Sequence, residues 1–377
     1  MAVTVGVPRE TAAGERRVAL VPEVVRRMTG DGGGFEVVVE AGAGEGAHHA
    51  DAAYAEAGAT IGDPWAAELL AKVAPPSAEE IGRLRSGQVL VGHLEPLTAP
   101  ETARALAAAG VTSFAVEAIP RTTRAQSMDA LSSQATVAGY LAVLIAAREM
   151  GRFFPMLTTA AGTIPPAKVL VLGAGVAGLQ AIATARRLGA VVTGFDVRSV
   201  VKEQVSSLGA RFLEIEVGEG EGEGGYAKEL SAEQQQAIKR GVSEAATRMD
   251  AVITTAQIPG RPAPKLIDAA GVEGMATGSV IVDLAGASGG NCELTEPGQT
   301  AVKHGVTITA PLNLPSEMAE HASQLYAQNV RSLVELMVGE GGALALDFDD
   351  EIIAGSCLTR EGEIVHEGAK RAAGAGS

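Results

Sequence analysis

The chain has 377 residues, of which 46% are hydrophobic and 20% are charged, and its formal net charge is −15. This composition is typical of a globular protein, and the length predicts two domains of roughly 150 to 200 residues because it exceeds what one hydrophobic core supports. The acidic charge and the lack of a basic run exclude nonspecific nucleic-acid binding, since a phosphate backbone must be met by a surplus of lysine and arginine.

Cysteine usage and hydropathy predict a cytoplasmic protein without a metal site. Cys292 and Cys357 lie far apart without metal-ligand spacing, which fits a reducing compartment. The N-terminal residues follow a strand-like pattern rather than a basic segment with an apolar run, so we expect no secretory signal. The most apolar stretch, residues 135–147, is shorter than the about twenty residues of a membrane helix and predicts a buried core helix without membrane insertion.

The first third of the chain alternates short apolar runs with helix-like segments, which is the pattern of an α/β unit. Gly110 follows one of the helical segments and predicts its C-terminal end. The predicted strands cover residues 3–7, 35–40, 88–94 and 111–117, and the predicted helices cover residues 22–28, the stretch before Gly58, and residues 100–109.

A second α/β series follows a proline- and threonine-rich turn at residues 155–166. A long helix over residues 316–338 leads back to the first domain, and residues 349–368 predict a hairpin with its turn near 360–362. The predicted strands of this series cover residues 168–172, 190–196, 250–256, 279–285 and 306–310.

These elements predict an α/β fold with two Rossmann-like domains, each built on a parallel doubly wound sheet, and a cleft between the domains. We expect the first domain to be discontinuous, formed by residues 1–133 and 318–377, and the second domain to cover residues 134–317.

The run GAGVAG, from Gly173 through Val176 and Ala177 to Gly178, comes directly after a predicted strand and opens a predicted helix. Gly173 permits a tight turn, Gly175 lets the backbone approach a pyrophosphate, and Gly178 allows the helix to pack closely on the strand. The helix N-terminus then presents free N–H groups to phosphates. This context predicts a dinucleotide-binding site.

Asp196 ends the next predicted strand, about twenty residues further on, where it can accept hydrogen bonds from the adenosine ribose. Its charge disfavours a 2′-phosphate and therefore favours NAD(H) over NADP(H). Arg198 keeps the opposite preference open, because an arginine nearby can accommodate that phosphate. A structural role for Asp196, capping a turn at the strand end, also stays open.

Residues 160–192, AAGTIPPAKVLVLGAGVAGLQAIATARRLGAVV, resemble the NAD-binding domain of transhydrogenase alpha subunits and of the related alanine dehydrogenases. The resemblance covers nearly the whole chain. It includes residues 8–25, 124–134, 224–229, 254–264, 289–298 and the C-terminal hairpin.

The resemblance implies roles for two groups of residues. The loop RTTRAQSMDALSS is similar to the transhydrogenase loop that surrounds the nicotinamide, through Arg121, Gln126, Asp129 and Ser132. The implied NAD(H)-binding residues outside the GAGVAG run are Asp196, Val197, Arg198, Gly225, Tyr226, Thr255, Ala256 and Gln257.

The segment around Tyr226 resembles a mobile loop that closes over bound nucleotide. The repetitive stretch GEGEGEGG at residues 218–225 precedes it and has no apolar face to bury, so it predicts a flexible arm. A tolerated surface insertion is the alternative.

An alanine dehydrogenase is the alternative enzyme. Three residues match functional positions of those enzymes. Arg17 matches the position that contacts the substrate carboxylate, Lys72 matches a position that contacts the substrate, and His93 matches the position that acts as acid or base. The sequence departs from them at Ala287, where alanine dehydrogenases place a catalytic aspartate. A third interpretation is a non-enzymatic NAD-sensing module.

The resemblance favours the NAD(H)-binding subunit of a proton-translocating transhydrogenase, in the form whose membrane segments are separate chains. Hydride transfer between two nicotinamides needs alignment rather than a protein nucleophile or metal. The resemblance implies a homodimer on the cytoplasmic face of the inner membrane, bound through membrane subunits that include an NADP(H)-binding domain.

Overall fold

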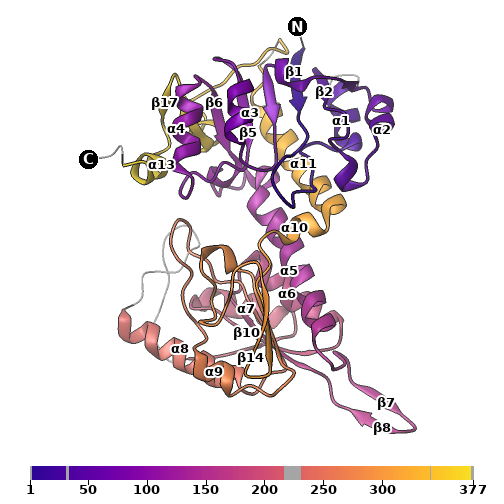
Figure 1. The fold of residues 1–377 in the computed structure, drawn as a ribbon, viewed down its shortest axis with the longest axis vertical. Helices are drawn as coiled ribbons and strands as arrows, with labels where there is room; N and C mark the ends of the chain where they lie inside the picture. Colours follow the sequence, from indigo (N-terminus) through magenta and orange to yellow (C-terminus); the bar gives the residue numbers. More distant parts are fainter. Residues whose placement is uncertain (1, 31–33, 216–230, 340, 375–377) are drawn as a thin grey trace. The chain divides into compact units, whose positions relative to one another are not determined.

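The structure is a computed structural model that describes residues 2–30, 34–215, 231–339 and 341–374. The chain folds into two compact units (Figure 1). Unit 1 is formed by residues 1–134 and 315–377, and unit 2 is formed by residues 135–314. The predicted arm at residues 218–225 lies outside the described residues.

Unit 1 is built on an eight-stranded sheet with the order β17-β16-β6-β5-β4-β1-β2-β3. The six strands β1 to β6 are parallel, and the C-terminal strands β16 and β17 add an antiparallel hairpin beside β6. The strands are β1 (Val3–Val7), β2 (Phe35–Val39), β3 (Thr60–Ile61), β4 (Leu69–Ala71), β5 (Val89–Gly92), β6 (Thr112–Ala115), β16 (Cys357–Arg360) and β17 (Glu363–Ile364).

Both faces of this sheet are covered by apolar side chains, as parallel strands require. Leu69 and Ala71 join the core beneath α1, α2, α11 and α12, whereas Leu70 joins the core beneath α4 and α13. The helices are α1 (Pro22–Thr29), α2 (Asp51–Glu56), α3 (Ala78–Arg83), α4 (Pro100–Ala108), α11 (Ala319–Leu336), α12 (Glu351–Ser356) and α13 (Glu367–Ala372), with short 3-10 helices η1 (Glu45–Ala47), η2 (Pro64–Ala66), η3 (Val116–Ala118) and η4 (Gln126–Met128).

Unit 2 has a seven-stranded sheet with the order β11-β10-β9-β12-β13-β15-β14, in which β14 alone is antiparallel to its neighbour. Without β14, this is the strand order of a dinucleotide-binding Rossmann sheet. The strands are β9 (Lys168–Leu172), β10 (Val191–Phe195), β11 (Arg211–Phe212), β12 (Ala251–Thr254), β13 (Val280–Asp283), β14 (Thr300–Lys303) and β15 (Val306–Thr309).

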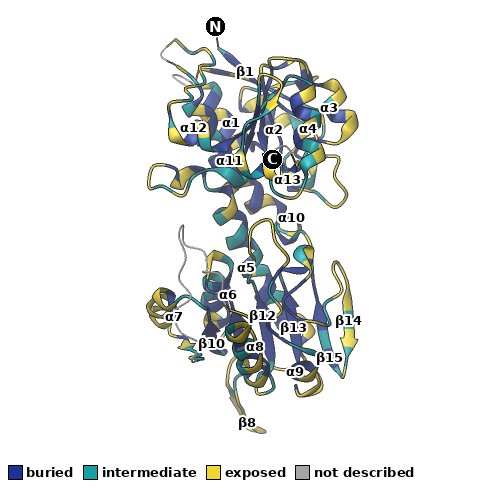
Figure 2. Ribbon diagram, turned by 90° about the vertical axis from the view of Figure 1, so that its left-hand side faces the viewer, coloured by how far each residue is buried: buried dark blue, intermediate teal, exposed yellow. Residues whose placement is uncertain are grey.

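Alternate residues of β9 again enter two separate cores, and Figure 2 shows the central strands β12 and β13 as buried. Val169 and Val171 pack under α5, α6 and α7, whereas Leu170 and Leu172 pack under α8 and α9. The helices are α5 (Ala130–Glu149), which begins in unit 1, α6 (Val176–Arg187), α7 (Lys202–Ser207), α8 (Ala232–Ala246), α9 (Ala269–Glu273) and α10 (Leu314–Glu317), with η5 (Ser199–Val201) and η7 (Gly286–Ser288).

The predicted α/β class with two Rossmann-like units is confirmed, and four local predictions need correction. The turn at 155–166 contains a hairpin, β7 (Leu157–Thr159) and β8 (Gly162–Ile164), and the helix at 316–338 is divided into α10 and α11. Residues 351–356 of the expected hairpin form α12, because Asp350 accepts hydrogen bonds from the amides of Ile352 and Ile353 and starts a helix. The strands β3, β4, β11 and β14 were not predicted, because each is only two to four residues long.

The apolar stretch predicted as a core helix belongs to α5, which is longer than that stretch. Among the described residues, α5 is long and apolar enough to cross a membrane by length and composition. A core helix passes the same test, and Ala142, Val143 and Ala146 of α5 are fully buried in the core of unit 2.

Gly139 of α5 sets the distance between α5 and α6. A Cβ atom at this position would lie 2.1 Å from the carbonyl oxygen of Ala177, which is closer than van der Waals contact allows. Gly139→Ala should therefore force the helices apart and lower the free energy of unfolding by about 1 to 3 kcal/mol. Chemical denaturation followed by circular dichroism measures this change.

Gly151→Ala is the matched control, because a Cβ atom at Gly151 would meet no other atom within 4 Å. Equal stability of the two variants would contradict the close helix contact.

Candidate functional site

Three strands of unit 2 end side by side at one edge of the sheet. Leu172 of β9 is aligned with Phe195 of β10 and with Thr254 of β12. The residues that follow these strands therefore meet at the carboxyl edge, where the chain order reverses between β9 and β12. Ligands of open α/β sheets bind at this switch point.

The GAGVAG run forms the turn from β9 into α6 as the sequence predicted. Gly173 has φ of 96°, a left-handed conformation that favours glycine. A Cβ atom at Gly178 would lie 1.8 Å from the carbonyl oxygen of Gly173, so only glycine lets α6 approach the strand this closely. A Cβ atom at Gly175 would meet nothing within 4 Å, which leaves open space beside this backbone.

The N-terminus of α6 can receive an anion. Among the described residues no side chain caps this helix, and the exposed Val176 and the half-buried Ala177 follow Gly175 as its first residues. Their N–H groups belong to the first turn, which has no partners inside the helix. The open space at Gly175 and these donors fit a pyrophosphate.

Asp196 follows β10 and lies beside this turn. Its carboxylate accepts hydrogen bonds from the amide of Ala174 at 2.7 Å and from the amide of Arg198 at 2.9 Å. The Arg198 guanidinium donates two further hydrogen bonds to it, each at 2.9 Å. Burial alone raises the pKa of Asp196, but the hydrogen bonds from Arg198 and Ala174 outweigh burial and hold this pKa below its ordinary value.

These contacts show the structural role that the sequence left open for Asp196. Asp196 caps the turn that contains Arg198, and it also ties the N–H of Ala174 in the glycine turn. The arginine that could accept a 2′-phosphate is paired with the carboxylate that would repel this phosphate. Val197, between the two, is half-buried and packs against the core beneath α8.

The segment after β12 contributes Thr255, Ala256 and Gln257. The Thr255 hydroxyl lies 3.2 Å from the carbonyl oxygens of both Leu172 and Gly173, so it contacts the end of β9. Gln257 is exposed and donates through Nε2 to the carbonyl of Leu284 at 2.9 Å. The predicted residues after β9, β10 and β12 are thus brought together at one edge.

Two residues that support this segment were missed from the sequence. The side chain of Asn291 accepts a hydrogen bond from the amide of Ala256 at 3.0 Å and donates to its carbonyl at 2.8 Å. Asp283, fully buried at the end of β13, accepts from the amide of Asn291 at 2.8 Å and from the Thr254 hydroxyl at 2.8 Å. An aspartate at a predicted strand end, as at Asp196, was the available signal for Asp283.

The polar loop predicted to surround the nicotinamide lies in unit 1, between β6 and α5. Ala125 and Met128 are buried in the unit 1 core and anchor the loop. Gln126 and Ser127, in the 3-10 helix η4, are exposed, as is Arg121. The apolar anchors therefore present the polar residues to solvent.

Asp129 and Ser132, two of the predicted residues, contact each other at the start of α5. One carboxylate oxygen of Asp129 accepts from the Ser132 amide at 2.9 Å, and the other accepts from the Ser132 hydroxyl at 2.6 Å. An aspartate in this position satisfies a free N–H of the first helical turn. Gly225 and Tyr226, also predicted for the site, lie outside the described residues.

The residues shared with alanine dehydrogenases lie in unit 1. Lys72 follows β4, is almost fully buried, and forms salt bridges with Glu10 at 3.0 Å and Glu80 at 2.9 Å. Burial lowers the pKa of the Lys72 ammonium, but the two carboxylates outweigh burial and raise it above its usual value. Arg17 forms a salt bridge of 2.6 Å with Glu15.

His93 follows β5, and its imidazole stacks on the Tyr326 ring with centroids 5.3 Å apart. Its Nδ1 lies 3.5 Å from a carboxylate oxygen of Glu117, and its Nε2 is buried with no hydrogen-bond partner in the part of the chain that the structure describes. Burial raises the pKa of Glu117, whereas His93 and backbone amides lower it more, so the carboxylate is held below its usual pKa.

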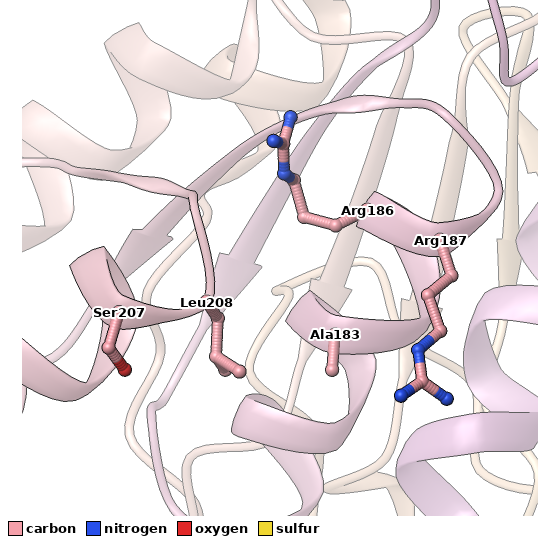
Figure 3. A pocket seen from close by; sticks show the side chains of 5 residues that line it. All are labelled: Ala183, Arg186, Arg187, Ser207 and Leu208. Atoms are coloured by element: carbon pink, nitrogen blue, oxygen red, sulfur yellow. The ribbon is translucent and has the colours of Figure 1, made fainter.

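An open hollow at the C-terminal end of α6 is separate from the predicted site. Arg186, Arg187, Ser207 and Leu208 line it together with Ala183 (Figure 3). The glycine turn lies at the N-terminal end of the same helix, so the hollow does not include the predicted dinucleotide residues.

The chain matches a described protein family over both halves. The family described as Alanine dehydrogenase/PNT, N-terminal domain, matches residues 6–138, and its C-terminal domain matches residues 142–367.

Curated relatives cover nearly all of the chain. The first part of the NAD(P) transhydrogenase subunit alpha of Rhodospirillum rubrum is 47% identical over 376 residues, which cover 96% of this chain and 97% of that protein. NAD(P) transhydrogenase subunit alpha of Haemophilus influenzae is 45% identical, with 95% of this chain and 71% of that protein covered. Alanine dehydrogenase of Mycolicibacterium smegmatis is 32% identical, with 96% and 95% covered.

Solved structures agree with this relationship. A transhydrogenase from Sinorhizobium meliloti is similar with a TM-score of 0.87 and 47% identity, covering 96% of this chain and 100% of that chain. An L-alanine dehydrogenase is similar with a TM-score of 0.80 and 29% identity, covering 98% and 99%. Matched by both domains over most of its length, the chain belongs to the alanine dehydrogenase/PNT family.

Proposed function

We propose that this chain is the NAD(H)-binding subunit of a proton-translocating transhydrogenase, which transfers hydride between NADH and NADP⁺ held by a partner subunit. The observation that carries the proposal is the glycine turn at Gly173, with Asp196 beside it, in a chain whose relatives at 45 to 47% identity are named transhydrogenase alpha subunits.

The described residues fit NAD(H) on structural grounds. The open space at Gly175 and the uncapped N-terminus of α6 suit a pyrophosphate, and Asp196 would accept hydrogen bonds from the adenosine ribose in exchange for those that it accepts from the Arg198 side chain. The nicotinamide supplies the hydride chemistry when it is bound. The chain itself needs to hold and orient the dinucleotide, through Gln126 and Arg121 and through Asp129 and Ser132 at the start of α5.

An amino-acid dehydrogenase is less well supported. Ala287 stands in η7, at the position where alanine dehydrogenases are expected to place a catalytic aspartate, and its methyl group cannot exchange a proton. His93 and Lys72 are present, but a redox reaction on an amino acid also requires proton transfer at the substrate. Hydride transfer between two nicotinamides has no such requirement, so the missing carboxylate favours the transhydrogenase.

The direct test combines the purified chain with a partner domain that carries NADP⁺. We expect NADH-dependent reduction of NADP⁺ in the mixture and no alanine-dependent reduction of NAD⁺ by the chain alone. Robust alanine turnover would support the amino-acid dehydrogenase instead, and NADH binding without transfer to any partner would support an NAD-sensing module.

Asp196→Ala should weaken NADH binding and strengthen NADPH binding. The substitution removes a ribose acceptor and leaves the Arg198 guanidinium without the carboxylate that neutralises it. One charge-assisted hydrogen bond is worth about 1.5 to 3 kcal/mol, so the ratio of the two affinities should change by at least about tenfold. Equilibrium titration with each nucleotide measures both affinities.

The double variant Asp196→Ala, Arg198→Ala is the control for this mechanism. It lacks the Arg198 guanidinium and should therefore lose the gain in NADPH affinity, while NADH binding stays weak. Unchanged affinities in Asp196→Ala would reduce Asp196 to a structural cap.

Gln126→Asn should slow hydride transfer much more than it weakens NADH binding. Shortening this exposed side chain by one methylene shifts its amide, and transfer tolerates misalignment of the reacting atoms poorly. Single-turnover transfer to NADP⁺ on the partner domain, measured beside NADH titration of the isolated variant, separates the two effects. A variant with the full transfer rate would remove Gln126 from the site.

The proposal includes a homodimer bound to membrane subunits on the cytoplasmic face of the inner membrane. The hairpin β7–β8 and the residues before it supply a self-association surface, because Phe153, Met156 and Ile164 are 53%, 62% and 45% exposed. Exposed apolar side chains on an isolated two-stranded sheet are typical of an interaction surface.

Met156→Asp combined with Ile164→Asp should shift the chain from dimer to monomer in sedimentation equilibrium. A charged side chain in an apolar interface loses hydration without gaining a partner. Val302→Asp on β14 is the control, since Val302 is 67% exposed on a different strand. An unchanged dimer in the double variant would exclude the hairpin as the interface.

A further inference from the structure

The polar loop of unit 1 is held by a side chain that lies outside it. Asn329 is in α11 and is 8% exposed. Its Nδ2 donates to the carbonyl of Ser127 at 2.8 Å, and its Oδ1 accepts from the Ser133 hydroxyl at 2.7 Å. One buried amide thus joins the backbone of η4 to the first turn of α5, on both sides of Asp129.

This contact continues into a buried polar network. Gln134 donates through Nε2 to the Ser133 hydroxyl at 3.2 Å and accepts from Arg17 at 2.8 Å. Glu15 in turn holds the Arg17 guanidinium, and the side chains of Arg17 and Glu15 are 8% and 2% exposed. Arg17, which matches a substrate position of alanine dehydrogenases, is therefore connected to the polar loop through Gln134 and Ser133.

The backbone hydrogen bonds of the loop differ in length. The amides of Ala125 and Met128 donate to the carbonyls of Thr122 and Ala125 at 3.1 Å and 2.9 Å, whereas the amides of Gln126 and Asp129 lie 3.4 Å from their carbonyl acceptors, at the long end of the hydrogen-bond range. The bidentate ion pair between Arg124 and Asp350 is formed by an arginine that is 52% exposed, so solvent and salt screen it. The buried, well-formed bonds of Asn329 are the stronger constraint on orientation.

We propose that Asn329 is a positioning residue for hydride transfer, which orients Gln126 and Asp129 through the Ser127 carbonyl and the Ser133 hydroxyl. This inference rests on the proposed function. Asn329 acts through these two groups and needs no contact with the nucleotide.

Asn329→Ala should slow single-turnover hydride transfer by at least about fivefold, the effect of one buried hydrogen bond on alignment. The affinity for NADH should change by less than about twofold, because the residues proposed to hold the pyrophosphate and the adenosine lie in unit 2. Asn329→Asp keeps the acceptor for Ser133 but turns a carboxylate oxygen toward the Ser127 carbonyl, so it should slow transfer at least as much as Asn329→Ala.

Ser113→Ala is the matched control. Its hydroxyl forms a buried hydrogen bond of 2.6 Å with Thr359, in the same unit but away from the loop. The single tryptophan, Trp65, is buried in unit 1 and reports unfolding of that unit by fluorescence. The control should lose stability like Asn329→Ala and keep the full transfer rate. Equal rates in the two variants would overturn the proposal.

Hydrogen exchange of residues 121–133 tests, without a partner domain, whether the hydrogen bonds of Asn329 hold the polar loop. Asn329→Ala should exchange faster there by at least about fivefold, whereas Ser113→Ala should match the unmodified chain. Ser133→Ala should produce part of this effect, and combining it with Asn329→Ala should add less than the sum of the single changes. Exchange that stays slow in Asn329→Asp and Ser133→Ala would overturn the proposal even if Asn329→Ala fails to fold.

These readouts separate the two ideas. Failure of the unmodified chain to transfer hydride would refute the proposed function and, with it, the role of Asn329 in transfer. Fast exchange in Asn329→Ala together with an unchanged transfer rate would leave the proposed function standing and refute the positioning role.

Discussion

Parallel register places the polar residues of unit 2 at one edge. The main-chain bonds that align Leu172 with Phe195 and Thr254 also decide that Gly173, Asp196 and Thr255 follow at the same level. No side chain at this edge needs to reach far, and each is held by backbone groups of a neighbouring strand or turn. The lack of a Cβ atom at Gly178 then lets α6 begin directly above this edge. Without the parallel register or the close approach of α6, these hydrogen-bond donors and acceptors would lie apart, although each of them is a common group in proteins.

The two units divide the work that the proposed activity requires. In unit 2, glycine backbone and the Asp196–Arg198 pair supply shape and charge for a dinucleotide. In unit 1, apolar anchors and a buried amide hold polar side chains toward solvent. The proposed function therefore assigns binding strength to unit 2 and alignment to unit 1, so that substitutions should affect one with little effect on the other.

Much of this arrangement could be predicted from the sequence, because it depends on local patterns. The GAGVAG run and Asp196 follow strands whose apolar runs are long enough to recognise, and their roles in the turn agree with the structure. The pairing of Asp196 with Arg198 could not be predicted, since either residue could have faced solvent.

Contacts between segments that are far apart in the chain could not be predicted from the sequence. Asn329 and Ser127 are 202 residues apart, and nothing local in α11 marks one asparagine among its polar residues. The contact between Asn291 and Ala256 could not be predicted either. It depends on the left-handed conformations of Gly289 and Gly290, which turn the chain back toward β12. Short strands such as β4 could not be predicted for another reason, because two or three residues show no periodicity.

The discontinuity of unit 1 has a consequence for synthesis on the ribosome. Thr359 of β16 forms a hydrogen bond with Ser113 of β6, which lies 246 residues earlier in the chain. The Tyr326 hydroxyl donates to the carbonyl of Lys72, which lies 254 residues earlier. All of unit 2 is translated before these partners emerge. Unit 2 can therefore complete its sheet as the nascent chain grows, whereas β6 waits with an unpaired edge. During that interval this edge can pair with other chains.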